Sequence, residues 1–448
     1  MNRLGTWIGL IALMLAVFDQ THSAVAVAAL LLAGQALPAF IVPAVVARVE
    51  ASSRGRELSG LYFFEAVVTA VLAVLLWNFW LPAVLLLAAL DGTAALAASA
   101  LLRAELARAA REQAEVEHSG IAGADKGLEQ AVAAAERRAN AAMNVAFSGT
   151  FVLGPLLGGA IVAAAGAPAA LFVDAGSFLV CGALLIDLHP YVQVAGGASV
   201  RARLLAAWTH VNEASSLRGL LLVDAVALIL YESAAPIEVT YAKVTLHVGD
   251  RGFGLLLTTW GLGAVLGSVV FARSIRRPLG RMLSAGALAI GLAYFGFAGA
   301  PSLALACIAA LIGGVGNGVE LPSMISLVQR LTPQGLHGRM MGALESLNSL
   351  CVAIGLPLGG LLVALSSPRA AFVVIGLGLV VTSVILLLVS RGGPEEPLSA
   401  EAHSPLVASP PSVLRELPPD GAPDPSERPL GDGGFGDTPA ASGATEEP

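Results

Sequence analysis

The chain has 448 residues, of which 56% are hydrophobic and only 13% are charged. A soluble domain carries about 25% charged residues, so this composition excludes an ordinary soluble protein and indicates a chain that crosses a membrane several times. The three cysteines, Cys181, Cys307 and Cys351, lie in apolar runs without a metal-like spacing. We therefore expect neither a metal nor a cofactor.

The formal net charge of −7 comes from the carboxy-terminal end of the chain. Residues 392–448 hold 11 acidic and two basic residues, a net of −9, which leaves +2 for the rest. The same segment contains 12 of the 25 prolines. A segment of this kind cannot bury enough apolar surface to fold, so 392–448 is interpreted as a disordered tail.

Apolar runs predict six membrane helices in a first bundle, residues 1–188. The first run, Leu4 to Phe18, has 15 residues, fewer than the roughly 20 that a span needs. We expect either an upstream start or a short interfacial helix. The charged segment 103–138 is interpreted as a long cytoplasmic loop forming a solvated helical hairpin; a membrane-surface or partner-binding role is the alternative. The other five helices are predicted at 24–47, 59–79, 82–102, 139–166 and 169–188.

A cytoplasmic linker is predicted at 189–218, followed by a second six-helix bundle at 219–391. Its helices are predicted at 219–241, 253–272, 283–300, 303–327, 340–365 and 370–389. With both termini in the cytoplasm, 22 of the 25 basic residues fall in cytoplasmic segments. Only Lys243, Arg251 and Arg369 then face outward. The positive-inside rule favours this orientation.

A glycine and proline motif lies inside the apolar run 139–166. Its members are Gly149, Gly154, Pro155, Gly158 and Gly159. Gly154 and Gly158 are four residues apart and share one helix face, the spacing at which two membrane helices approach closely. Pro155 is expected to bend the helix. The alternative interpretation is a generic pair of close-packed membrane helices.

The motif recurs in the second bundle. A shift of 201 positions places Gly154 on Gly355, Gly158 on Gly359 and Gly159 on Gly360. A shift of 225 positions places Ala47-Arg48 on Ala272-Arg273. Two parallel six-helix halves are a recurring arrangement in transporters.

The spacing from Gly149 to Gly159 resembles the fifth-helix motif of drug:proton antiporters in the major facilitator superfamily. The stretch Gln329 to Arg339 resembles the helix 10–11 loop of the branch with enterobactin-type and macrolide-type exporters. The resemblance covers about residues 5–389. It implies an all-α membrane protein with the major facilitator fold, two six-helix bundles related by pseudo-two-fold symmetry. It also implies a monomer in the inner membrane. The sequence contains no nucleophile–base pair, metal cluster or phosphate loop, so we expect neither an enzyme nor a nucleic-acid-binding protein.

The function implied is proton-coupled efflux of small amphiphilic molecules, such as drugs, macrolides or siderophores, by alternating access. The partners would be the small-molecule substrate, protons and the lipid bilayer. One departure concerns the loop between helices 2 and 3, where the family's usual aspartate is absent unless Glu50 substitutes. The alternatives are a facilitator-fold sensor or scaffold and a proton-coupled importer, against which the helix 5 motif argues. The candidate inner-gate arginines are Arg48, Arg54, Arg56, Arg273, Arg276, Arg277 and Arg339.

Acidic residues inside the predicted helices are the candidates for chemistry, since a carboxyl in the bilayer must be protonated, paired or in contact with water. In the resembling fold, helices 1, 4, 7 and 10 line the central cavity. The proton-coupling candidates on these helices are Asp91, Glu232 and Glu320. The substrate-cavity candidates are Asp19, Asp224, Tyr231, Glu238 and Asn317. The alternative for each acid is a structural hydrogen bond to a neighbouring helix, and Glu65 and Glu345 are assigned to such contacts near the inner face.

Overall fold

The computed structural model describes residues 2–42, 57–118, 132, 135, 149–186, 215–274, 276–333 and 336–390. Every regular element in these residues is a helix. Most of the chain, Met1–Ser399, forms one compact unit. Several predictions fall outside the described residues: half of the 103–138 loop, residues 139–148 of the predicted helix 139–166, the linker as far as residue 214, the tail and the arginines at positions 48, 54 and 56.

The amino-terminal half consists of α1 (Asn2–Thr21), α2 (Ala24–Leu31), the π-helical segment η1 (Leu32–Ala36), α4 (Glu57–Leu75), the short 3₁₀ segment η2 (Leu76–Asn78), α5 (Leu81–His118), the helix Gly149–Ala165 and α7 (Ala167–Leu184). The first helix is 20 residues long, so the expectation of a short α1 is wrong. Polar residues at both of its ends continue the helix beyond the apolar run, and the hydropathy pattern did not include them.

The carboxy-terminal half consists of α9 (Ser215–Glu232), α10 (Ala234–Thr240), the π-helical segment η3 (Tyr241–Thr245), α11 (Gly249–Arg273), α12 (Leu279–Gly299), α13 (Leu303–Leu331), α14 (His337–Leu365) and α15 (Pro368–Ser390). The predicted helix 219–241 is interrupted at Ser233, which separates α9 from α10. The Ser233 hydroxyl donates to the Ile229 carbonyl at 2.8 Å, so it occupies a backbone acceptor at this interruption.

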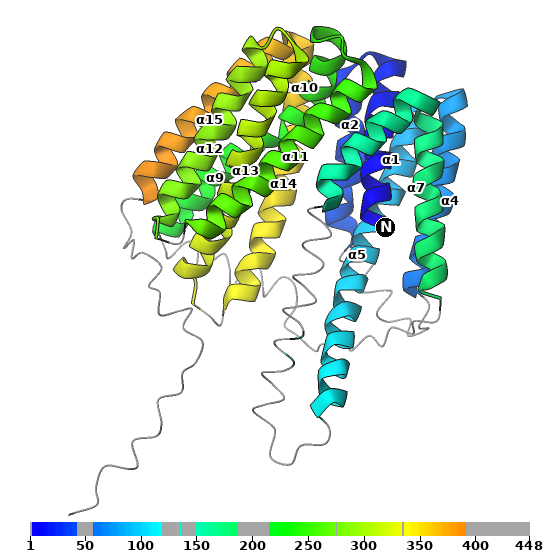
Figure 1. Ribbon diagram of the computed structural model, residues 1–448, viewed down its shortest axis with the longest axis horizontal. Coiled ribbons are helices and arrows are strands. Elements are labelled where there is room, and N and C mark those ends of the chain that lie inside the picture. The colour runs from blue at the N-terminus through cyan, green and yellow to red at the C-terminus, as the bar shows by residue number, and fades with distance from the viewer. Residues whose placement is uncertain are drawn as a thin grey trace, which may run out of the picture. The chain divides into compact units, whose positions relative to one another are not determined.

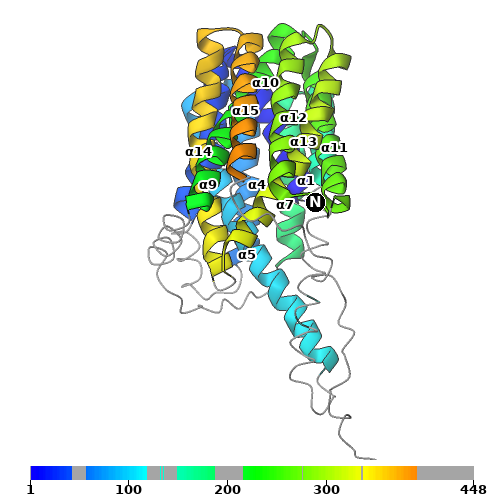
Figure 2. The same cartoon turned by 90° about the vertical axis from the view of Figure 1, so that its left-hand side faces the viewer.

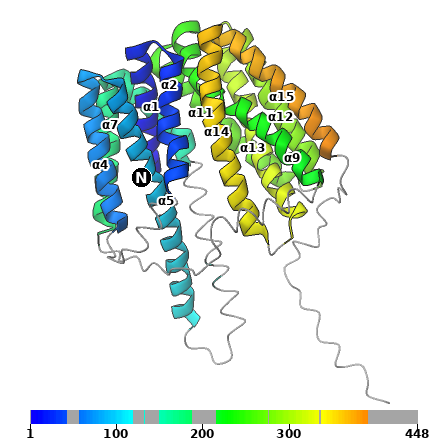
Figure 3. The same ribbon diagram turned by 180° about the vertical axis from the view of Figure 1, so that it is seen from behind.

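Eleven of the described helices are long and apolar enough to cross a membrane, and the helix Gly149–Ala165 is a shorter apolar one. Large apolar side chains face outward; Leu365 is 78% exposed and Trp77 is 65% exposed. Such an exterior is stable in lipid, where helices satisfy all their backbone hydrogen bonds internally. The helices of the two halves lie on opposite sides of the compact unit (Figure 1 and Figure 3).

Helix α5 continues well past the predicted membrane segment 82–102. It spans 38 residues, and its carboxy-terminal part extends beyond the ends of the neighbouring helices (Figure 2). The segment after Leu102 is rich in alanine, glutamate and arginine, which favour helix where hydropathy does not predict one. The first part of the expected loop hairpin, as far as His118, is therefore a continuation of α5.

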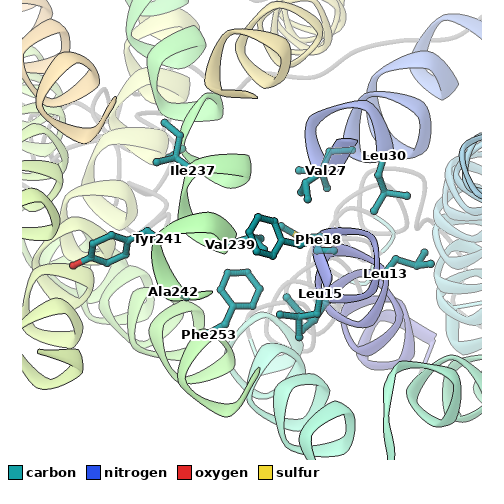
Figure 4. Packing of buried hydrophobic residues seen from close by; sticks show 14 of the residues in the cluster. Leu13, Leu15, Phe18, Val27, Leu30, Ile237, Val239, Tyr241, Ala242 and Phe253 are labelled. Atoms are coloured by element: carbon teal, nitrogen blue, oxygen red, sulfur yellow. The ribbon is translucent and has the colours of Figure 1, made fainter. Parts of the chain in front are cut away.

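The two halves pack tightly against each other near the end of the unit where α1 ends, which we call the distal end; the end where α1 begins is the proximal end. Leu15 of α1 and Val27 of α2 are fully buried and face Val239 of α10 and Phe253 of α11 across this interface (Figure 4). Lipid tails are as apolar as these side chains, so the hydrophobic effect does not drive the association. The interface is stabilised instead by the close packing of its side chains.

Glycines permit the closest approaches between the halves. A Cβ placed on Gly159 would lie 3.0 Å from the Cα of Gly254 in α11, so the two backbones touch directly. In the second half, a Cβ on Gly360 would lie 2.9 Å from Ala28 of α2. The helix Gly149–Ala165 and α14 therefore make equivalent contacts, each with a helix of the opposite half.

A second feature repeats between the halves at the distal end. His22, in the turn between α1 and α2, and His247, in the turn before α11, both have positive φ, at 50° and 54°. Histidine is one of the few non-glycine residues enriched in this conformation. Their separation, 247 minus 22, equals the 225 positions of the sequence repeat. The two halves therefore share a turn as well as a helix order.

Candidate functional site: a central acidic cavity

A cavity of about 1160 Å³ lies between the two halves. One wall consists of α1 and the start of the helix Gly149–Ala165, and the other consists mainly of α9, α11 and α13. The lining includes Arg3 in the first turn of α1 and Ala272 in the last turn of α11, so the cavity extends to the proximal end. The volume is slightly above the usual range for small-molecule sites, about 300–1,000 Å³.

Three of the predicted acids line this cavity together: Asp224 and Glu232 of α9 and Glu320 of α13. The predicted Tyr231 and Asn317 also line it. The rest of the lining is mostly apolar, with Val265, Val269, Leu321 and Met324 as examples. An apolar chamber with a few carboxyls suits a ligand that combines an apolar body with a positive charge or hydrogen-bond donors.

Sequence reasoning missed six polar or aromatic members of the lining: Arg3, Trp7, Thr150, Phe151, Ser268 and Asn348. Trp7 and Phe151 form an edge-to-face pair with ring centroids 5.1 Å apart, which joins α1 to the helix Gly149–Ala165. The sequence Gly5-Thr6-Trp7 has a Gly-x-Trp pattern, and this pattern could have identified Trp7 as a candidate residue of the cavity. Nothing in the sequence around Asn348 distinguishes it from other polar residues of α14.

Glycines create the space for two of the cavity acids. A Cβ on Gly355 of α14 would lie 2.8 Å from the Cβ of Glu232. Similarly, a Cβ on Gly286 of α12 would lie 2.8 Å from the Cβ of Glu320. Both distances are shorter than real contacts allow, so these acids are held against bare helix backbone. Gly355 is one of the predicted second-half glycines, whereas Gly286 was not predicted.

Aromatic rings continue inward from the cavity wall. Tyr231 lies 6.0 Å from Trp260, which stacks on Tyr294 at 5.9 Å, and Tyr294 stacks on Phe372 at 5.6 Å. These centroid distances lie in the range of favourable ring pairs. The cluster joins α9, α11, α12 and α15, so it fixes the wall on which the α9 acids stand.

Glu238 lies away from the central cavity. It borders a separate small cavity of about 10 Å³, together with Tyr241, Trp260 and Phe297. That volume is about the minimum that holds one water molecule. The structure therefore does not place Glu238 where a substrate in the central cavity would touch it, unlike Asp224 and Glu232 of the preceding helix.

Asp19 also lies outside the cavity lining. One of its carboxylate oxygens is 2.8 Å from the Nζ of Lys243 in η3, and Lys243 also contacts Asp250 of α11. This three-residue ion cluster links α1 to the carboxy-terminal half at the distal end. Asp19 therefore belongs to the closed side of the molecule and not to the substrate cavity for which it was predicted.

Asp91 is likewise absent from the cavity lining. Its Oδ1 accepts a hydrogen bond of 3.1 Å from the Thr69 hydroxyl of α4. Glu65, assigned from the sequence to an interhelix contact, is fully buried, yet neither of its carboxyl oxygens has a hydrogen-bond partner among the described residues. Glu345 is exposed on α14. Asp91 and Glu65 of the amino-terminal half thus lie outside the lining of the central cavity.

The helix 5 motif forms the other wall. A Cβ on Gly154 would collide with Trp7, and one on Gly158 would lie 3.1 Å from Ile11 of α1, whereas Gly149 has open space around it. The chain remains helical through Pro155. Of the candidate gate arginines, Arg273, Arg276 and Arg277 are exposed, and Arg339 lies in the first turn of α14.

Comparisons with known proteins agree with this geometry. Residues 220–419 match the family described as Major Facilitator Superfamily. The chain is 28% identical over 267 residues to the multidrug efflux pump Tap of Mycolicibacterium fortuitum, covering 56% of this chain and 63% of that protein. It is 27% identical over 247 residues to the enterobactin exporter EntS of Citrobacter koseri, covering 53% of this chain and 57% of that protein. These matches span about three fifths of each relative.

Solved structures agree over most of the chain. A nucleoside transporter, NupG, superposes with a TM-score of 0.65 at 11% identity, over 87% of this chain and 96% of that one. A bacterial homologue of the iron transporter ferroportin, solved in an inward-facing state, superposes with a TM-score of 0.64 at 18% identity, over 87% of this chain and 96% of that one. The chain has the major facilitator fold. It resembles the efflux branch of that superfamily, which confirms the predicted fold class and the predicted resemblance.

Proposed function

We propose that this chain exports small amphiphilic molecules, cationic ones above all, across the cytoplasmic membrane in exchange for protons. The observation that carries the proposal is the central cavity, in which Asp224, Glu232 and Glu320 stand in a mostly apolar wall. A carboxyl there can bind either a proton or a cationic group, so the two ligands compete for one site. Such competition couples their movements when the site is exposed alternately to the two sides.

The closed distal end supports the alternating-access part of the proposal. The Asp19–Lys243–Asp250 cluster and the Gly159–Gly254 contact join the halves there, while the cavity reaches the proximal end. From the distribution of basic residues we place the proximal end in the cytoplasm. The chain described here is then the state that takes up its substrate from the cytoplasm.

The direction of transport rests on the relatives. Tap and EntS are named as an efflux pump and an exporter, respectively. An importer of the same fold would also have a cavity between its halves. We therefore favour export on the sequence matches and on the helix 5 motif, and we base the substrate class on the acids in the cavity wall.

Inside-out vesicles that contain the full chain test the proposal with ethidium as a cationic probe. An imposed gradient, acidic inside, should drive ethidium accumulation, and adding ethidium should release protons from the vesicle lumen. The Glu232→Gln variant is the site control, and Glu345→Gln is the matched control on the exposed face of α14. If a panel of cationic, neutral and anionic probes shows no gradient-driven uptake, the proposed function is wrong.

A further inference from the structure

Three carboxyls gather in the amino-terminal half, behind the wall of the central cavity. Glu65 comes from α4, Asp91 from α5 and Asp174 from α7, and none of the three lines the cavity. Glu65 is 0% exposed and Asp174 is 4% exposed. Glu65 lies one turn before Thr69 on α4, and the Thr69 hydroxyl donates to Asp91 of α5 at 3.1 Å. Helix α4 also packs against α7, which carries Asp174. The three acids therefore form one cluster, which we call the buried triad.

The triad has few hydrogen-bond donors and no cationic partner among the described residues. The Thr69 hydroxyl donates to Asp91, but both oxygens of Glu65 and Oδ1 of Asp174 have no partner in the described part of the chain. Lys243 pairs with Asp19 and Asp250 at the distal end and contacts no triad carboxyl. An ionised carboxylate inside a membrane needs a partner or water, so unpartnered oxygens indicate bound protons.

The other titratable groups on the packed helices do not change this balance. Tyr62 of α4 and Cys181 of α7 are uncharged in their ordinary forms, and Arg3 of α1 lines the central cavity. A metal ion is also not indicated, because the described residues contain no group of three His, Cys, Asp or Glu side chains arranged to hold one. The ligand that fits three close carboxyls without a cation is the proton.

Asp174 is seated on the backbone of α1. A Cβ on Gly5 would lie 2.5 Å from Oδ1 of Asp174, and a Cβ on Gly9 would lie 3.1 Å from its Cγ. These glycines are four residues apart and form one face, so the carboxyl of α7 rests in a groove that any larger side chain would fill. The position of α1 therefore depends on the state of this carboxyl.

Helix α1 also reaches both functional ends of the molecule. Its first turns contribute Arg3 and Trp7 to the central cavity. Its last turn contributes Asp19 to the ion cluster that closes the distal end. If Asp174 becomes charged, the change acts on α1. This helix lines the central cavity and also supplies Asp19 to the ion cluster at the distal end.

We propose that Glu65, Asp91 and Asp174 form a proton-binding site in the amino-terminal half, separate from the cavity acids. In the closed-distal state the triad holds its protons, and deprotonation loosens the seat of α7 on α1. The transported substrate and this proton then bind at different places, and α1 connects them. The part of the inference that concerns efflux rests on the proposed function, whereas the existence of the proton site does not.

Infrared difference spectroscopy on the purified full chain tests the site without any transport. As pH rises, the carbonyl-stretch band of protonated carboxyls should disappear in wild type, and Glu65→Gln and Asp174→Asn should each lose part of the titrating band. Asp91→Asn is measured as a third variant in case one of these fails to fold. The Glu345→Gln variant, altered at an exposed acid, is the matched control and should keep the band of the triad carboxyls.

Two results would overturn the proton site. One is a titrating band of wild-type size in every correctly folded triad variant. The other is loss of the band on addition of sodium at constant pH, which would make the triad a cation site. Transport is then measured separately: with ethidium uptake intact in wild type, Glu65→Gln should release fewer protons per ethidium than wild type while still binding ethidium, because the cavity acids still exchange their protons. If wild type does not transport at all, the proposed function fails and the infrared result still decides the proton site.

Discussion

The amino-terminal and carboxy-terminal halves contain the same packing scaffold but place their acids differently. The helix Gly149–Ala165 lies against α1 through Gly154, and α14 lies against α9 through Gly355. In the first half the side chain met by the glycine is Trp7, and in the second half it is Glu232. One repeat unit therefore presents an indole to the cavity where the other presents a carboxyl.

The same asymmetry holds for the remaining acids. In the carboxy-terminal half Asp224, Glu232 and Glu320 face the cavity, whereas in the amino-terminal half Glu65 and Asp174 are buried between helices. A repeated backbone can thus separate two tasks, binding a substrate and holding a proton, between its halves. Substitutions at the glycine contacts that both halves share should then lower the stability of the protein. Substitutions at the acids, which differ between the halves, should change binding or proton release without lowering stability.

The largest effect should follow from filling the shared glycine contacts. Gly154→Leu and Gly355→Leu would each force a side chain into a space that the structure does not contain, because Trp7 and the Ile229 carbonyl already occupy it. Overpacking costs about 1–3 kcal/mol or more in a packed interior. We expect both variants to show low membrane levels and a lowered thermal unfolding midpoint in detergent.

The matched control for these variants is Leu153→Ala, since Leu153 is exposed beside Gly154. It should keep wild-type protein levels. If Gly154→Leu and Gly355→Leu unfold at the wild-type temperature, the glycine contacts are not what holds the halves in place. If only one of them is destabilised, the two halves do not share the scaffold that the sequence repeat predicts.

The next effect should be confined to the cavity acids. Glu232→Gln keeps the shape of the side chain and removes its charge. It should therefore weaken binding of ethidium about thirtyfold or more, because truncating one partner of a buried charge pair costs about 2 kcal/mol or more. Binding of a neutral probe of similar size should change little. Fluorescence polarisation of the two probes measures both values on the purified chain.

A clear contradiction would be equal loss for the charged and neutral probes, which would show that the substitution disturbs the cavity shape. The Glu65→Gln variant sharpens the comparison between the halves. It should leave ethidium binding at constant pH nearly unchanged, because Glu65 does not line the cavity. Loss of binding in Glu65→Gln would place the substrate in the amino-terminal half after all.

An intermediate effect is expected at the distal ion cluster. Lys243→Met removes the cation between Asp19 and Asp250, so it should destabilise the closed distal end. Partly exposed pairs contribute up to about 1 kcal/mol, which is about a fivefold shift between states. A cysteine introduced at Val239, after the native cysteines are replaced, should then react faster with an impermeant maleimide.

Arg251→Gln is the control for that measurement, since Arg251 is an exposed cation that directly follows Asp250 in the first turn of α11. It should not change the labelling rate. If Lys243→Met leaves the fully buried position 239 as protected as in wild type, the Gly159–Gly254 contact and the apolar core close the distal end without help from the ions.

The helices of this chain were largely predictable because an apolar run of about 20 residues matches the thickness of a bilayer. The errors arose where a helix does not coincide with its apolar run. Helix α5 continues without a break to His118, where a separate helical hairpin was expected. Pro236, which cannot donate to the Glu232 carbonyl, lies one turn after the interruption at Ser233. Both features depend on local backbone chemistry that a hydropathy pattern does not record.

The site was predictable in part. The structure places Asp224, Glu232 and Glu320 in one cavity lining, and all three lie on helices that the family resemblance expects to line the central cavity. The same reasoning misplaced Asp19, because depth along a helix does not reveal that Lys243 lies at the same level on another helix. The environment of Glu65 could not be predicted either, since its burial depends on how α4 packs on α7, which is a property of the tertiary structure.

The smallest predicted effect concerns the hydrogen bond from Thr69 to Asp91 of the buried triad. Thr69→Val is nearly isosteric and removes the donor to Asp91, so it should lower the free energy of unfolding by about 1 kcal/mol. Thr93→Val is the matched control, because the Thr93 hydroxyl donates to the Ala89 carbonyl of its own helix instead of to an acid. The control should change the unfolding midpoint by less. Only Thr69→Val should change how that midpoint depends on pH, since only it alters a titratable group of the triad. If the two variants show the same pH profile as wild type, Asp91 does not take part in proton binding, and the site is restricted to Glu65 and Asp174.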